Sequence, residues 1–124
     1  MIEAGPGELI DKITILQIKT ERIAESGKLA NIRRELDMLL GTRRSALPPS
    51  PELDRLEKQL KRINEALWEI EDEIRRCERG GDFGERFVRL ARSVYRQNDR
   101  RAALKRQIND LTGAQIVEEK SYAP

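Results

Sequence analysis

The feature that most constrains the fold of this chain is an unbroken heptad repeat of apolar residues between Leu53 and Cys77. The steps between successive apolar residues alternate between three and four, and charged residues fill most of the other positions. The repeat consists of Leu53, Leu56, Leu60, Ile63, Leu67, Ile70, Ile74 and Cys77. Such spacing is typical of one long helix with a narrow apolar seam, as in a coiled coil. The seam is roughly 36 Å long, so another element has to cover it.

Local signals give this helix the boundaries 51–79. Ser50 is a favourable N-cap, Pro51 is tolerated in the first turn, and Gly80 with Gly81 supplies the stop. Asp82 and Glu85 have the spacing of a capping box and open the next helix. Prolines at 48, 49 and 51 break the chain before the long helix. The other elements are predicted as helices at 5–26, 28–40 and 83–112, with an extended tail at 113–124.

The predicted fold is a single all-α domain spanning 1–124. Two long helices joined by a short turn lie antiparallel, which makes 51–112 a long helical hairpin. The two shorter N-terminal helices pack along it, as in a four-helix bundle. The acidic stretch 65–73 faces arginines between 86 and 96, and this pairing favours one register of the hairpin over a slipped one. We expect Leu67 and Ile70, at mid-seam, to be more buried than Leu53.

The apolar seam of the last helix is interrupted by polar residues. The predicted register brings Asn64 near Asn98. A polar layer inside a bundle either fixes the register or binds a ligand, and both interpretations are kept. The candidates for this layer are Asn64, Gln97, Asn98 and Arg101.

Basic residues gather at the opposite end of the hairpin from its turn. Like charges repel, so a negative group is expected near them: either Glu118 and Glu119 of the tail, or an external anion such as a phosphate, a lipid headgroup or an acidic protein. A face that is simply solvated is the third interpretation. The cluster comprises Arg55, Lys58, Lys61, Arg62, Arg100, Arg101, Lys105 and Arg106.

Carboxylates at metal-ligand spacing occur in two helices. Glu8 with Asp11, and Glu69 with Asp72, each share a helix face, and two facing pairs could hold Mg²⁺ or Mn²⁺. The alternative is that they serve as dipole partners and surface charges. The chain has no histidine, which excludes His-ligated zinc and histidine-activated nucleophiles within one chain. We assign no catalytic residue and no cofactor from the sequence.

Composition limits the possible partners. The net charge of +2 and the few aromatic residues give no reason to expect sequence-specific nucleic-acid binding. The chain lacks an apolar run long enough to span a membrane and a recognisable secretory signal. The single cysteine, Cys77, lies on the apolar seam, where a buried thiol is the simplest interpretation.

Four strings resemble a family of small, functionally uncharacterised bacterial proteins. They are GELIDKITIL (7–16), LWEIEDEIR (67–75), ARSVYRQNDRRAALKRQIN (91–109) and IVEEKSY (116–122). The resemblance implies a bacterial, cytoplasmic protein, associated with glycosyltransferases and cell-surface polysaccharide genes, and it carries over no catalytic residue. The polar residues inside the strings are further site candidates: Glu8, Asp11, Lys12, Asn98, Asp99, Arg101, Glu118, Glu119 and Lys120.

These observations favour a helical interaction or scaffold module that forms a homodimer or binds a partner protein, because four helices of unequal length leave part of the seam uncovered. The alternative is a metal-dependent enzyme that acts on a phosphorylated substrate through Glu8, Asp11, Glu69 and Asp72.

Overall fold

The chain forms four helices in a computed structural model, which describes the backbone of residues 5–121 and the side chains of residues 5–113. The described residues contain no β-strand, so the all-α prediction is confirmed. The helices are α1 (Gly5–Arg22), α2 (Ser26–Ala46), α3 (Pro51–Gly80) and α4 (Glu85–Ser121).

The ends of α3 follow the predicted signals. The hydroxyl oxygen of Ser50 accepts the backbone N–H of Leu53 at 3.2 Å, and Pro51 occupies the first turn. At the other end Gly81 has a φ of 68°, a left-handed conformation that glycine adopts without strain. The side chain of Asp82 accepts the N–H of Gly84 at 3.2 Å, and α4 therefore begins two residues later than expected.

Two helices are longer than predicted. α2 continues through Gly41 to Ala46, and α4 continues through Gly113 to Ser121, where an extended tail was expected. A glycine inside a helix costs only about 1 kcal/mol, and neither glycine is followed directly by proline, so neither one ends its helix. The remainder of the predicted tail, 122–124, lies outside the described residues.

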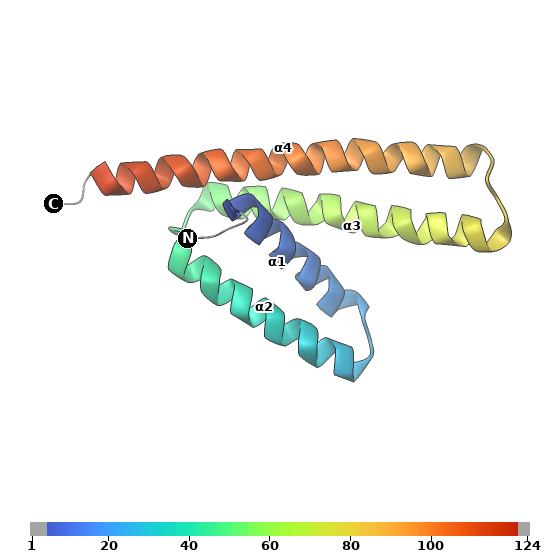
Figure 1. Cartoon of the computed structure of the whole chain (residues 1–124), viewed down its shortest axis with the longest axis horizontal. Helices are drawn as coiled ribbons and strands as arrows, with labels where there is room; N and C mark the ends of the chain where they lie inside the picture. The colour runs from blue at the N-terminus through green and yellow to red at the C-terminus, as the bar shows by residue number, and fades with distance from the viewer. Residues whose placement is uncertain (1–4, 122–124) are drawn as a thin grey trace.

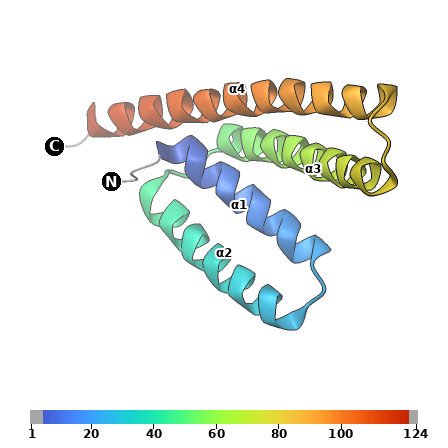
Figure 2. The same ribbon diagram turned by 45° about the vertical axis from the view of Figure 1, so that its right-hand side comes forward.

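The helices form two hairpins that diverge from a common end. α3 and α4 lie antiparallel, and α1 and α2 make the second, shorter hairpin (Figure 1). α1 is the central helix, since it packs against α2, α3 and α4. The hairpins meet where α3 begins and separate toward the turn at Gly81 (Figure 2). The part of the long hairpin nearest this turn, residues 70–96, is called the outer hairpin below.

The apolar core lies where the hairpins meet. α1, α3, α4 and the α2–α3 connection supply the buried side chains, and leucines of α2 pack on them from outside. The core contains Leu9, Ile10, Ile13, Leu47, Leu53, Leu56, Leu60, Leu104 and Ile108. An edge-to-face pair, Phe83 with Phe87, lies far from it at the hairpin turn.

Burial along the α3 seam runs opposite to the expected gradient. Leu53 is 1% exposed and Leu60 is 0% exposed, whereas Ile70 and Ile74 are only half-buried. The expectation that Leu53 is the less buried residue was therefore wrong. The reason is that α1 and Leu47 cover the first half of α3, while α1 diverges from the part of α3 nearest the hairpin turn (Figure 2). Cys77 is buried at 2% exposure, as a seam residue should be.

Arg43 connects the end of α2 to α3. Its Nη1 donates to both carboxylate oxygens of Glu57 at 3.1 Å, and its Nη2 donates to Asp54 Oδ1 at 3.0 Å. Burial raises the pKa of Glu57, although the charge of Arg43 opposes the shift. This clamp fixes the connection on which the core residue Leu47 lies.

Gly7 permits the closest approach of α1 to α4. A Cβ atom at this position would lie 2.5 Å from the backbone oxygen of Lys105, and the Gly7 N–H donates to Asn109 Oδ1 at 2.7 Å. Gly7→Ala is therefore expected to lower the free energy of unfolding by about 1–3 kcal/mol, measured by urea denaturation.

Gly113→Ala is the matched control. A Cβ there meets no described atom within 4 Å, and the residue lies inside α4, so the variant is expected to gain up to about 1 kcal/mol. A Gly7→Ala variant as stable as the Gly113→Ala variant would contradict the close packing of α1 on α4.

Candidate functional site

A buried ion pair joins α1 to α4. Asp11 is 3% exposed, and Arg101 donates to its carboxylate through Nε at 2.9 Å and through Nη2 at 2.5 Å. The hydrogen bond to Asp11 is the main cause of a raised pKa for Arg101. A two-pronged pairing of this kind fixes both the position and the orientation of the two side chains.

α3 contributes a third polar side chain, Asn64, to the Asp11–Arg101 pair. Its amide nitrogen donates to Asp11 Oδ1 and to Thr14 Oγ1, each at 2.9 Å. The Thr14 hydroxyl donates in turn to the backbone oxygen of Asp11 at 2.7 Å. Three helices therefore meet at one buried carboxylate, and we call Asp11, Thr14, Asn64 and Arg101 the polar network.

Two of the four residues proposed for the polar layer are brought together in the structure. Asn64 and Arg101 meet, but through Asp11 of a third helix and not directly across the hairpin. Asn98 is exposed and Gln97 is half-buried, and neither residue takes part in these hydrogen bonds. A register argument for two helices could not include a carboxylate that α1 brings between them.

The first turns of α1 bind residues of α4 that lie four positions apart. Gly7 bonds to Asn109, Glu8 forms an ion pair with Lys105, and Asp11 binds Arg101. Residues 101, 105 and 109 share one face of α4. Two of the recognised strings, GELIDKITIL and the segment 91–109, are thus opposite sides of one contact. The two acidic residues in the first string, Glu8 and Asp11, and the two basic residues four positions apart in the second, Arg101 and Lys105, were the signal that could have predicted it.

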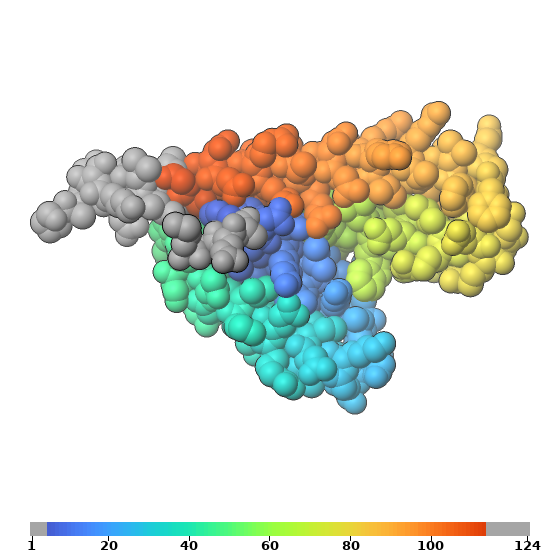
Figure 3. All heavy atoms as spheres, in the orientation of Figure 1, coloured from blue at the N-terminus to red at the C-terminus, as the bar shows by residue number. Residues whose placement is uncertain are grey.

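A pocket of about 210 Å³ lies beside the polar network, at the point where α1 separates from the long hairpin. The surface is hollowed there between the two hairpins (Figure 3). Trp68 lines this pocket together with Arg101 and Asn64. The full lining is Ile15, Ile18, Lys19, Asn64, Leu67, Trp68, Glu71 and Arg101.

The predicted basic cluster divides into two groups. Three members bind carboxylates of α1: Lys61 with Glu21 at 2.5 Å, Arg101 with Asp11, and Lys105 with Glu8. The other five are exposed and form no ion pair among the described residues: Arg55, Lys58, Arg62, Arg100 and Arg106.

The described backbone of the tail, residues 113–121, continues α4 and does not fold back over the basic cluster. Because α4 stays helical to Ser121, Glu118 follows Arg106 by roughly 18 Å along the helix axis. The side chains of Glu118, Glu119 and Lys120 lie outside the described residues. For three of the basic residues, the counter-charge is supplied by α1.

The candidate metal ligands are not brought together. Glu8 and Asp11 bind cations of α4, whereas Glu69 forms an ion pair with Arg22 and Asp72 with Arg75. The hydrogen bond from Arg75 lowers the pKa of Asp72. Within residues 5–113 no three acidic or thiol side chains form a group that could hold a metal ion, so the carboxylates lend no support to the metal-enzyme alternative.

Comparison with known proteins places the chain in a family without assigning an activity. Along the described part of the chain, no helix has the length and apolar character required to cross a bilayer. No curated protein and no solved structure matches the sequence. A family of unknown function, DUF6165, matches residues 1–124, and the chain therefore belongs to that family.

Proposed function

We propose that the protein is a helical interaction module that self-associates through its outer hairpin. The observation that carries the proposal is that neither α1 nor α2 covers residues 70–96. Among the residues whose side chains are described, four large hydrophobic residues are exposed, and three of them lie in this segment: Phe83, Val88 and Tyr95, which is 74% exposed. In the same segment the seam residues Ile70 and Ile74 of α3 are only half-buried. Apolar surface concentrated in this way is typical of an interface.

The charges of the outer hairpin suit a second copy of the chain. On α3, Glu71 and Glu78 are exposed and form no ion pair among the described residues; Arg89, Arg92 and Arg96 are their basic counterparts on α4. A two-fold axis parallel to the helices, between two stacked outer hairpins, places α3 of one copy beside α4 of the other. Each acidic helix then faces a basic one, and the complementary charges favour this orientation.

The test is sedimentation equilibrium at tens of micromolar protein. The wild type is expected to sediment as a dimer, and Val88→Lys with Tyr95→Lys is expected to sediment as a monomer, because two lysines bury charge in the apolar surface and add to the basic helix. Circular dichroism should show unchanged helicity, since both side chains are exposed.

Met38→Lys is the control for this pair of substitutions. Met38 is the fourth exposed large hydrophobic residue and lies on α2, so the variant should remain dimeric. A wild-type monomer at these concentrations would contradict the proposal, and so would equal dissociation of the α2 and α4 variants.

The cellular setting of this module follows from the resemblance described above. We place the dimer in the bacterial cytoplasm, where it would connect enzymes of surface-glycan synthesis. Affinity purification from the native bacterium tests this setting: a glycosyltransferase should be recovered with the wild type and lost with the Val88→Lys, Tyr95→Lys variant.

A further inference from the structure

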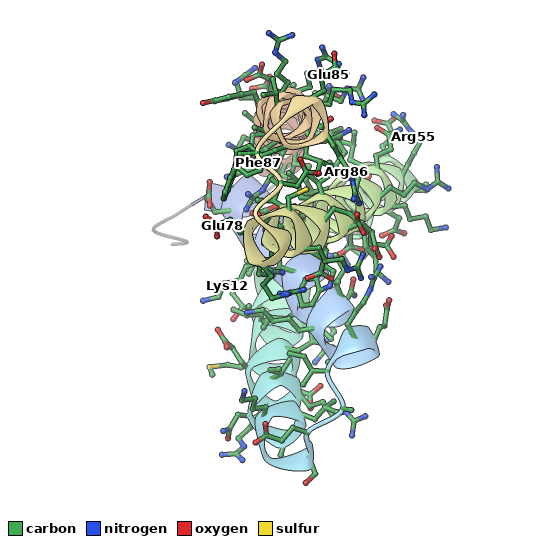
Figure 4. All side chains as sticks on the ribbon, turned by 90° about the vertical axis from the view of Figure 1, so that its right-hand side faces the viewer. Lys12, Arg55, Glu78, Glu85, Arg86 and Phe87 are labelled. Atoms are coloured by element: carbon green, nitrogen blue, oxygen red, sulfur yellow. The ribbon has the colours of Figure 1, made fainter. Side chains whose placement is uncertain are left out.

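The five members of the basic cluster that form no ion pair among the described residues lie outside the faces of α3 and α4 that bind α1. Arg55, Lys58 and Arg62 succeed one another at helical spacing on α3. On α4 the face bound by α1 contains residues 101, 105 and 109, whereas Arg100 and Ala103 lie on another side. Seen along the hairpin, Arg55 projects on the side opposite Phe87 (Figure 4).

A groove of about 420 Å³ runs between α3 and α4 on this side. Ile63, Ala103 and Leu104 make its apolar lining, and the small side chain of Ala103 leaves room between the helices. Arg62 and Arg100 line it from opposite helices, with Gln59 and Gln107 beside them. The groove therefore combines an apolar floor with cationic and amide groups at its edges.

No carboxylate among the described residues lies within ion-pair distance of the five basic residues at this surface. Asp54 and Glu57, the nearest acids in sequence to Arg55 and Lys58, are both held by Arg43. Asp99 and Asp110 lie on α4 but form no ion pair with Arg100 or Arg106 among the described residues. Clustered cations repel one another, so an acidic ligand would be favoured electrostatically at this surface.

We propose that the groove binds an acidic amphipathic helix of a partner protein. An apolar side chain of that helix enters between Ile63 and Leu104, and its carboxylates pair with Arg62, Arg100 and the neighbouring basic residues. The groove is a second surface, separate from the outer-hairpin residues Val88 and Tyr95.

The recessed shape of the groove favours a helix, rather than an anionic membrane, as its ligand. Leu104 is only 7% exposed, and Ile63 is half-buried, so the apolar groups are recessed. A protein that lies on a bilayer inserts protruding apolar side chains, and the exposed large hydrophobic residues of the described chain are elsewhere: Met38, Phe83, Val88 and Tyr95. A recessed groove instead accepts a side chain that protrudes from its ligand.

The test titrates the full chain into fluorescent synthetic peptides and measures anisotropy. The first peptide, of about 20 residues, carries leucines on one helical face with glutamates beside them; the second has glutamine in place of every glutamate. The acidic peptide is expected to bind about tenfold more tightly, and added salt should reduce the difference. Equal affinities for the two peptides would overturn the proposal.

Two variants separate the groove from a general charge effect. Arg62→Glu with Arg100→Glu should weaken acidic-peptide binding by about tenfold or more. Arg33→Glu with Arg34→Glu makes the same charge change at exposed positions of α2 and should change the affinity by less than about twofold. Ala103→Leu fills the groove without altering charge and should also weaken binding. Equal losses in the two charge-reversed variants would overturn the proposal.

Vesicles that contain phosphatidylglycerol distinguish a lipid ligand. The outcome that assigns the surface to a membrane has three parts: the wild-type chain co-sediments with these vesicles, the Arg62→Glu, Arg100→Glu variant does not, and neither peptide binds. That outcome would overturn the helix proposal. Unchanged helicity and dimer formation in this variant would show that the fold and the outer-hairpin interface are intact. A failure of the groove proposal can therefore be distinguished from a failure of the proposed dimer.

Discussion

Asp11→Ala is expected to lower the free energy of unfolding by about 3–5 kcal/mol. The carboxylate of Asp11 is almost completely buried and accepts hydrogen bonds from Arg101 and Asn64. Its removal leaves the Arg101 guanidinium in a partly buried position without its counter-ion, and desolvation makes that arrangement costly. The loss should be measured by urea unfolding followed by circular dichroism.

Two further variants serve as controls for the Asp11→Ala prediction. Glu35→Ala removes the partner of Lys12 in an exposed ion pair with side chains 43% and 59% exposed, and it should cost no more than about 1 kcal/mol. Asp11→Leu with Arg101→Met replaces both charges by apolar groups and should recover much of the stability lost by Asp11→Ala. If Asp11→Ala cost no more than Glu35→Ala, the polar network would not be a buried structural element.

The long α3 helix was predictable because all its local signals agree. The heptad seam, the Ser50 cap, Pro51 in the first turn and the glycine stop each indicate the same boundaries, and none depends on another part of the chain. Glycine alone proved a weaker signal. Gly41 and Gly113 were interpreted as helix ends, but the residues after them continue the helix, since only proline strongly forbids it.

The polar network was not predictable from a hairpin alone. Asn64 and Arg101 were candidates for a polar layer, whereas their common partner Asp11 was interpreted as a metal-ligand candidate. What decides its role is the path of α1, which places the N-terminal turns against α4. The same placement explains why the basic cluster divides, because α1 carries the carboxylates that neutralise one side of it.

The position of α1 also sets the second large effect on stability. Leu60→Ala is expected to cost about 2–5 kcal/mol, because Leu60 is 0% exposed in a core built by α1, α3 and α4. Ile74→Ala is the comparison variant. Ile74 lies on the same seam of α3, but its side chain is half-buried and packs in the outer hairpin. Water already reaches the Ile74 side chain in the folded chain. Its truncation to alanine therefore removes less buried apolar surface than Leu60→Ala does, and the space left behind opens toward solvent.

The two alanine variants should be compared below and above the concentration at which the chain dimerises. In the monomer, urea unfolding should show Ile74→Ala losing clearly less stability than Leu60→Ala. In the dimer the difference should narrow, because a second copy would cover the outer hairpin and bury Ile74 more completely. Equal losses already present in the monomer would contradict the burial gradient, since they would mean that some other part of the chain covers the outer hairpin in solution.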